Sequence, residues 1–415
     1  MYLSIATVIQ ADTLSPWRHV SVAPIVESVT LNSRFVPPPQ SMVLRELLKY
    51  TVTPSLSHLN ISDNQYDWLK AAYPRTLTKL EIQYQDPDDI PYAEEIDPVL
   101  GAWVVLKNLP LLQCLRLNNV FPSWSDVYPD IDQTAFPSLK EIFIKGWGRP
   151  IIDLYSHMTI PSDTIVQLSL RYESPDDWID EHPKLSQCVF SHLKGDSDPD
   201  ESSLQISLST DVEADSYVAI YAHKILPIYR QGKGRPIPGT PDITIFLEIF
   251  GDNDEDIPDI ELDVFLRQLA SSIPLDKLEI LDVSRLDFLV QVLQPISLSS
   301  KLSQICLNSI VSLDGFLDII MGDEKMFPAL RSLEISHRSP IEGMPVGIFA
   351  AGRRHLRELC QLLALWKNGN GRELESIHLI SEETEFLTLT AIVKSLKSLV
   401  TDAVTSYMDH WTKYD

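Results

Sequence analysis

The residues that could carry out chemistry are scattered along the chain and form no established motif. The segment Asp252-Asn-Asp-Glu-Asp256 resembles part of a calcium-binding loop, but Ile257 stands where that loop needs glycine, and the distal glutamate is absent. Gly232-Lys233-Gly234 is basic and flexible, yet it lacks the strand-to-helix context of a nucleotide-binding loop. The motifs of phosphate-binding loops, serine-hydrolase elbows and zinc proteases are missing. We therefore expect no enzyme activity, no cofactor and no metal site.

The charge and the cysteines narrow the class of partner. With 58 acidic and 34 basic residues, the chain has a formal charge of −24, which repels nucleic acid and anionic membranes. The four cysteines have no CxxC or zinc-finger spacing and suit a reducing compartment. No stretch reaches the ~20 apolar residues of a membrane span, and the short apolar start lacks the basic residues of a signal peptide. The sequence predicts a cytoplasmic or nuclear protein that binds neither nucleic acid nor membrane.

A three-position apolar pattern, L-x-x-L-x-L, recurs along the chain. Its last two positions are two residues apart, which is the period of a strand with one buried face, and its first lies where the chain turns into the strand. One such strand cannot bury its apolar face alone, whereas stacked copies form a parallel sheet with a continuous core. The copies begin at Val26, Leu56, Leu77, Leu112, Leu139, Ile165, Leu278, Leu302, Leu330 and Leu374.

These copies predict an α/β fold, an irregular and horseshoe-like leucine-rich-repeat solenoid. Its parallel sheet would form the concave face, with helices and loops on the convex face. We expect residues 1–20 to be an N-terminal segment or cap and 401–415 a C-terminal tail. Between them, residues 21–400 would form the solenoid, with an irregular insertion at about 172–251. Two sub-arrays joined near residue 230 are the alternative.

The segments between the copies have their own patterning. Helices are predicted at Met42–Tyr50, Pro98–Leu106, Asp215–Ile225, Ile260–Ala270, Asp314–Met321, Gly352–Trp366 and Glu383–Leu399. In the irregular middle, Leu204–Leu208 and Ile243–Ile249 are strand-like, and a basic loop rich in glycine and proline, Arg230–Gly239, lies between them. We expect long surface loops in this part of the chain.

Side chains alternate along a strand, so the neighbours of the buried residues face the solvent side of the predicted sheet. Sheets of this kind are binding surfaces by shape, and arginine and aromatic residues dominate contact energies. The residues expected to bind a protein on the concave face are Arg116, Phe143, Lys145, Arg171, Glu141, Glu334 and His378, of which the first four form the main cluster. An outer face that is polar simply because it meets water is the alternative interpretation.

Several repeat strands also carry a family likeness. Phe136-Pro-Ser-Leu-Lys-Glu-Ile-Phe-Ile144, Phe327-Pro-Ala-Leu-Arg-Ser-Leu-Glu-Ile335 and Leu109-Pro-Leu-Leu-Gln-Cys-Leu-Arg-Leu117 resemble the repeats of fungal F-box/leucine-rich-repeat proteins. The likeness covers roughly residues 20 to 400. In that family an F-box docks the adaptor subunit of a cullin ubiquitin ligase, and the repeats hold the substrate. No L-P-x-E-[IL] motif precedes the repeats here, so the likeness concerns the repeat part, and an adaptor partner is expected only if an F-box lies upstream.

The sequence thus predicts a non-enzymatic protein-binding scaffold, similar to the substrate-recognition part of an F-box ubiquitin-ligase receptor. The alternative is an acidic leucine-rich-repeat inhibitor or chaperone of a basic protein, attracted by the charge of −24. A third hypothesis is an enzyme site within Tyr172–Gly251, although no acid/base pair or ligand cluster is visible there.

Overall fold

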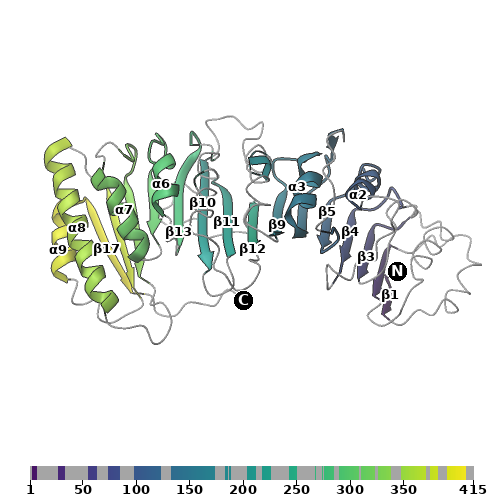
Figure 1. Cartoon of the computed structure of the whole chain (residues 1–415), viewed down its shortest axis with the longest axis horizontal. Coiled ribbons are helices and arrows are strands. Elements are labelled where there is room, and N and C mark those ends of the chain that lie inside the picture. The colour runs from purple at the N-terminus through teal and green to yellow at the C-terminus, as the bar shows by residue number, and fades with distance from the viewer. Residues whose placement is uncertain are drawn as a thin grey trace, which may run out of the picture. The chain divides into compact units, whose positions relative to one another are not determined.

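The structure of the chain, a computed structural model, divides into two compact units. Figure 1 labels their helices and strands. Unit 1 comprises Met1–Gly195 with Asp242–Glu255, and unit 2 comprises Asp196–Pro241 with Asp256–Asp415. The chain therefore passes from one unit to the other three times. The structure describes residues 2–6, 27–32, 55–62, 73–84, 98–122, 132–172, 183–185, 187, 203–211, 217–225, 243–249, 267, 273, 275–284, 289–307, 310–322, 326–337, 347–370, 374–381 and 390–407.

Unit 1 contains a parallel sheet with the strand order β1-β2-β3-β4-β5-β7-β9-β12. These strands are β1 (Tyr2–Ala6), β2 (Ser28–Asn32), β3 (His58–Ser62), β4 (Lys79–Gln83), β5 (Cys114–Asn118), β7 (Glu141–Trp147), β9 (Ile165–Tyr172) and β12 (Ile243–Ile249). Strands β6 (Thr134–Ala135) and β8 (Met158–Thr159) form a separate parallel pair. The predicted α/β class with parallel strands is confirmed, as is the strand at Ile243–Ile249.

The apolar pattern explains why these strands stack. In β3, β4, β5 and β7 every pattern position, such as Leu56 before β3, is at most 1% exposed. In β9 the prediction is wrong in detail, because Ile165 is 36% exposed and Val166 is buried in its place. The register gives the reason: Val166 lies opposite Ile142, the residue that was expected to face Leu168. The β9 copy is therefore shifted by two residues relative to the sequence prediction.

Among the described residues of unit 1, α2 (Pro98–Leu106) and α3 (Gly148–Ser156) are helices that pack against each other. The sequence predicted α2 but not α3. A Cβ on Gly146 would lie 3.7 Å from Ile151 of α3, and Gly146 shares its face of β7 with buried Ile142. Helix α3 therefore lies on the apolar side of the sheet, and the alternate side chains of β7 point away from it.

Glycine is required where α3 begins. A Cβ on Gly148 would collide with the phenol ring of Tyr172, which is buried at the end of β9. Gly146, two residues earlier, has a φ of 145°, a backbone conformation that side chains disfavour. These two glycines let the chain turn from β7 directly into α3.

Unit 2 contains a sheet with the strand order β11-β10-β13-β14-β15-β16-β17. Its strands are β10 (Ser203–Asp211), β11 (Tyr217–Ile225), β13 (Leu278–Ser284), β14 (Gln304–Leu307), β15 (Ser332–His337), β16 (Ser376–Ser381) and β17 (Asp402–Tyr407). All neighbouring pairs are parallel except β10 with β11, which is antiparallel. The helix predicted at Asp215–Ile225 is therefore wrong. Its apolar run is rich in β-branched and aromatic residues, which favour a strand when a partner such as β10 is present.

The helices with described bounds in unit 2 are α6 (Leu289–Ile296), α7 (Ile310–Gly322), α8 (Gly347–Asn370) and α9 (Thr390–Leu399). Consecutive helices pack against each other, α7 packs on β14 and β15, and α9 packs on β17. The predicted helices at Asp314–Met321 and Gly352–Trp366 are confirmed and are longer than expected. Helix α9 occupies the second part of the predicted Glu383–Leu399, whereas α6 was not predicted.

Other sequence predictions fall at the ends of the chain or outside the described residues. Strand β1 lies within the predicted N-terminal segment, and β17 lies within the predicted C-terminal tail, where it pairs with β16. Met42–Tyr50, Arg230–Gly239 and, apart from Arg267, Ile260–Ala270 lie outside the described residues. Within the described part of the chain, no helix has both the length and the apolar character that crossing a membrane requires.

Candidate protein-binding surface

The predicted binding residues of unit 1 lie on the side of the sheet away from α3. Parallel pairing aligns their strands residue by residue, so side chains form rows that run across the sheet. The central row is Asn60, Glu81, Arg116, Phe143 and Gln167. We call this side of β3, β4, β5, β7 and β9 the outer face of unit 1.

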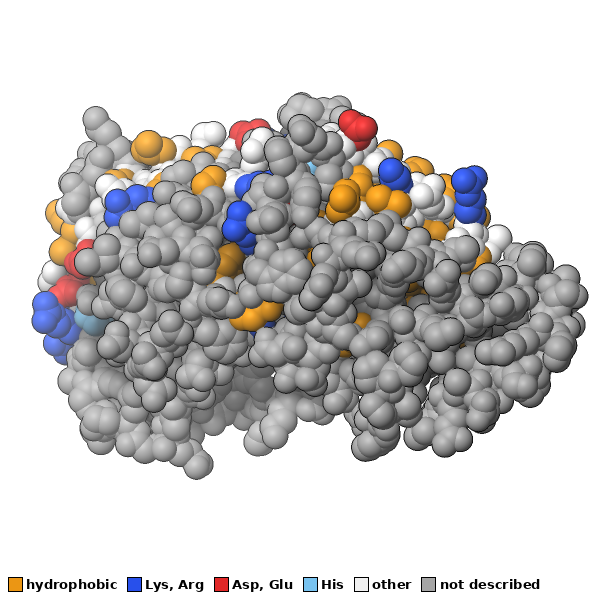
Figure 2. Space-filling view, turned by 45° about the vertical axis from the view of Figure 1, so that its right-hand side comes forward, with side chains coloured by type: hydrophobic (Ala, Val, Ile, Leu, Met, Phe, Trp, Pro, Cys, Tyr) orange, Lys and Arg blue, Asp and Glu red, His pale blue; other side chains and the backbone are white. Residues whose placement is uncertain are grey.

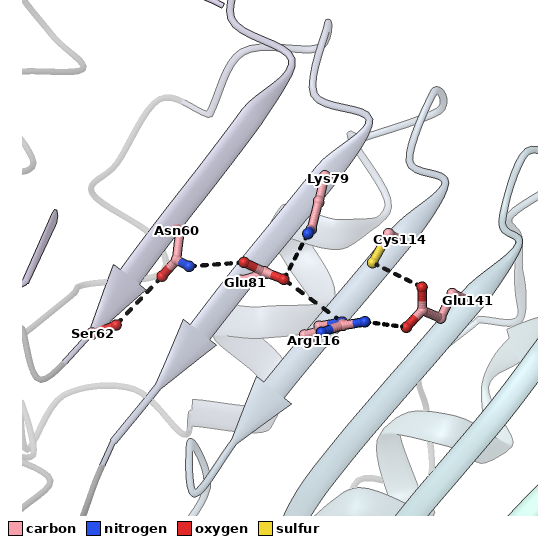
Figure 3. Close-up of polar contacts among 7 residues, drawn as sticks. All are labelled: Asn60, Ser62, Lys79, Glu81, Cys114, Arg116 and Glu141. Atoms are coloured by element: carbon pink, nitrogen blue, oxygen red, sulfur yellow. Dashed lines mark hydrogen bonds and ion pairs between the residues drawn. The ribbon is translucent and has the colours of Figure 1, made fainter. Parts of the chain in front are cut away.

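A chain of polar contacts links four neighbouring strands on this face (Figure 3). The Asn60 amide donates to Glu81 Oε2 at 2.8 Å, and Lys79 Nζ lies 2.9 Å from Glu81 Oε1. The Arg116 guanidinium lies between two carboxylates, with Nε 3.6 Å from Glu81 Oε1 and an NH2 donor 2.5 Å from Glu141 Oε1. We call these five residues the polar ladder.

The polar ladder is electrically balanced, because Lys79 and Arg116 match Glu81 and Glu141. Its ions are partly hydrated: the Arg116 side chain is 46% exposed and that of Glu141 is 39% exposed. Exposed ion pairs of this kind contribute about 0–1 kcal/mol each. The hydrogen bond to Glu141 raises the pKa of Arg116 above its ordinary value, so its charge is permanent. The ladder therefore mainly fixes the position of the Arg116 guanidinium.

Cys114 adjoins the ladder, but it is a poor candidate nucleophile. Its Sγ lies 3.7 Å from Glu141 Oε2. Partial burial and then the Glu141 carboxylate raise the pKa of the Cys114 thiol above its ordinary value. A thiol that stays protonated at neutral pH reacts slowly, because the thiolate is the reactive form.

The other predicted residues of unit 1 extend from the ladder toward the far end of β9. Phe143 lies level with Arg116, Lys145 lies level with Asn118 and Ser169, and Arg171 lies level with Trp147. Arg171 is thus two residues, or about 7 Å, beyond the level of Lys145. This follows from the two-residue shift of β9. The predicted cluster of Arg116, Phe143, Lys145 and Arg171 is therefore a diagonal line rather than a compact group.

The described charges of this face are mainly basic, in contrast to the chain as a whole. Basic residues number four and acidic residues two: Lys79, Arg116, Lys145 and Arg171 against Glu81 and Glu141. The acidic excess of the chain therefore lies elsewhere than in these described strands. Lys79, Glu81 and Asn60 occupy strand positions that the sequence predicts to face solvent, but they are not among the residues predicted to bind a protein. The sequence does not show the register that brings them together.

The last two predicted residues lie in unit 2, where they are level neighbours on β15 and β16. His378 Nδ1 is 3.7 Å from Glu334 Oε2. Glu334 is only 5% exposed, and Cys306 in the same row is also buried, so this row offers little contact surface. Beside it, the Ser376 hydroxyl donates to that of Ser332 at 2.8 Å. The seven predicted residues are thus divided between two units.

The described residues contain no group of three or more histidine, cysteine or acidic side chains that could hold a metal ion. No protein-family model matches the chain, and no curated protein matches it either.

Proposed function

We propose that the outer face of unit 1 binds another protein, and that the chain is a leucine-rich-repeat-type solenoid without catalytic activity. The observation that carries this proposal is the alignment of polar, charged and aromatic side chains in register across neighbouring parallel strands. The regular burial of the apolar pattern, strand after strand, supports the solenoid.

The size of the face is suited to a protein partner. The five strands of the outer face, spaced about 4.8 Å apart and each about five residues long, cover roughly 400 Å². A standard interface takes about 800 Å² from each partner, so this face could supply about half of it. A small molecule would instead need a deep and mainly apolar cavity.

Within this face, Phe143 and Arg116 are the expected centre of the contact. They are level neighbours on β7 and β5, and aromatic and arginine side chains are enriched among residues that dominate binding energy. The polar ladder holds the Arg116 side chain before a partner arrives. Binding therefore orders one flexible side chain fewer, which lowers the entropy cost of association.

The biological setting that fits this surface is substrate recognition, as in the repeat part of an F-box ubiquitin-ligase receptor. An acidic inhibitor or chaperone of a basic protein is the second candidate, and the charge of −24 favours it. The mainly basic outer face of unit 1 argues against that docking mode in this unit. A basic protein would have to dock on another part of the chain.

Site-specific cross-linking tests the proposal. We would replace Phe143 in the full chain with a photo-reactive phenylalanine analogue and irradiate it in a native extract at modest salt. The control places the same group at Met321, an exposed apolar residue of α7. We expect a discrete protein adduct at position 143 that Arg116→Ala weakens, and none at 321. Absence of an adduct at 143, or identical adducts at both positions, would refute the proposal.

The same experiment separates the candidate settings. Co-purification of the cullin-ligase adaptor with the full chain supports the receptor role. A basic partner whose capture falls steeply with ionic strength supports the inhibitor or chaperone role, because exposed charges are screened by salt.

A further inference from the structure

Helices α8 and α9 of unit 2 carry a charge opposite to that of the rest of the chain. Together they contain six basic residues and one acidic residue, a net charge of +5. The whole chain carries −24, so the residues outside these two helices carry −29. The basic residues are Arg353, Arg354, Arg357, Lys367, Lys394 and Lys397, and the acidic residue is Glu358.

The exposed side of α8 is a continuous stripe. Arg354, Arg357, Gln361, Leu365 and Asn368 are exposed and follow each other at intervals of three or four residues, so they lie on one face of the helix. The opposite face is apolar and buried, through Leu356, Leu359, Leu362, Leu363 and Trp366. Leu365 is 63% exposed in the middle of the polar stripe. The helix thus presents basic residues at one end of the stripe and an apolar side chain further along it.

Helix α9 extends this basic surface. It packs against α8, and Lys367 Nζ donates to the backbone carbonyl of Ser398 at 3.2 Å. Lys394 and Lys397 are exposed on α9, whereas Leu396 between them is buried. Figure 2 shows Lys and Arg side chains, with Asp or Glu and His side chains beside them, at its left-hand edge, the side on which α8 and α9 lie in Figure 1. Arg354 also pairs with Glu358, the acidic residue of the two helices, at 2.8 Å.

We propose that the exposed surface of α8 and α9 docks a short acidic segment of another protein that carries one apolar side chain. Carboxylates of the segment would pair with Arg357, Lys394 and Lys397, and its apolar residue would cover Leu365. The stripe from Arg354 to Asn368 is about 21 Å long, which matches roughly seven residues of extended chain. This surface is separate from the outer face of unit 1 and does not depend on the function proposed for it.

A short acidic segment fits better than a nucleic acid or a membrane. Both of these are extended anionic surfaces, and any part that reached beyond α8 and α9 would meet a chain whose remaining charge is −29. A segment of seven or so residues can stay within the basic area. The exposed Leu365 also favours a peptide, because an apolar side chain gains nothing from a phosphate backbone.

The test uses fluorescence anisotropy of the full chain with a labelled glutamate-rich peptide of about eight residues and a central leucine. The test variant is Arg357→Glu/Lys394→Glu/Lys397→Glu. The control variant, Lys107→Glu/Lys140→Glu/Lys301→Glu, has the same charge change at exposed lysines outside α8 and α9. We expect the test variant to weaken binding by about tenfold or more, because close like charges oppose association. The control variant should retain most of the affinity.

Further arms make the result decisive. A peptide with serine in place of its leucine should bind several-fold more weakly to the wild-type chain and equally to Leu365→Ser. Circular dichroism spectra that match the wild type exclude unfolding of either variant. Equal losses in the two triple variants, no binding by the wild-type chain, or tighter binding of single-stranded DNA or phosphatidylserine vesicles to the same lysines would overturn the proposal.

Discussion

At Cys114, neighbouring charges act on one thiol in opposite directions. Burial and the Glu141 carboxylate raise its pKa, whereas the cations Arg116 and Lys79 lower it, and the net change is upward. Cys114 thus lies on the strand face proposed for binding, but its thiol has low nucleophilic reactivity at neutral pH. Two neighbouring cations alone would lower the pKa of a thiol and make it more reactive. Burial and the Glu141 carboxylate outweigh them here.

We predict that Glu141→Gln lowers the pKa of Cys114, because it removes the second-largest cause of the increase. The measurement is the rate of iodoacetamide alkylation between about pH 7 and pH 10, followed by mass spectrometry of the Cys114 peptide. Cys360 in unit 2, whose pKa is raised by burial, serves as an internal control. An unchanged midpoint for Cys114, or an equal change at Cys360, would contradict this account.

The same pKa increase has a consequence for stability at high pH. The pKa of Cys114 is higher in the folded than in the unfolded chain. The contribution of this thiol to the free energy of unfolding is therefore fully present below the ordinary pKa of 9.0, and it is lost as the pH rises through the pKa of the folded chain. Denaturant midpoints of Cys114→Ser should therefore decline less steeply above pH 9 than those of the wild type.

Among the elements, strands were predicted better than helices. The apolar pattern located β3, β4, β5 and β7, since alternation with a period of two has few other interpretations. The helix predicted at Asp215–Ile225 was wrong because a continuous apolar run is compatible with a helix or a strand. The pairing with β10 favours the strand. For the candidate site, the sequence predicted which strand positions face outward, but not which side chains meet there. Glu141 on β7 lies level with Cys114 on the neighbouring strand β5, and it contacts Arg116 two residues further along β5. The sequence does not give the register of these two strands.

We predict that the polar ladder contributes less to the free energy of unfolding than the buried apolar core does. A double-mutant cycle of Arg116→Ala and Glu141→Ala should give a coupling energy of about 0–1 kcal/mol that decreases with added salt. Ile142→Ala, which removes a fully buried side chain next to Glu141, should cost about 2–5 kcal/mol. Urea denaturation provides both values. A coupling energy above that of the core substitution would show that the ladder is a main source of stability.

At the scale of the whole molecule, sequence order and structural neighbourhood differ in the middle of the chain. Strand β12 comes after β10 and β11 in the sequence, yet it pairs with β9 in unit 1. Strand β10 pairs with β13 in unit 2. The predicted solenoid ran through this region in sequence order. No local sequence pattern shows that β12 and not β10 pairs with β9, because β10 and β12 have similar apolar alternation.

Hydrogen exchange can test this assignment. We predict that Leu168→Ala in β9 increases amide exchange in residues 243–249 more than in 203–211, because β12 loses a stable neighbour. Leu281→Ala in β13 should have the reverse effect, since Leu281 is buried opposite Ile206 of β10. If residues 243–249 responded to Leu281→Ala and not to Leu168→Ala, the pairing of β12 with β9 would be wrong.

The late position of β12 also affects the chain during its synthesis. When β9 leaves the ribosome, the strand that will cover its edge lies about 77 residues further along the message. At typical translation rates that segment takes about 4–15 s to appear. Throughout that interval β9 presents unpaired backbone groups, which other nascent chains can join. Slow translation of residues 173–249 should therefore increase the demand of this protein for chaperones.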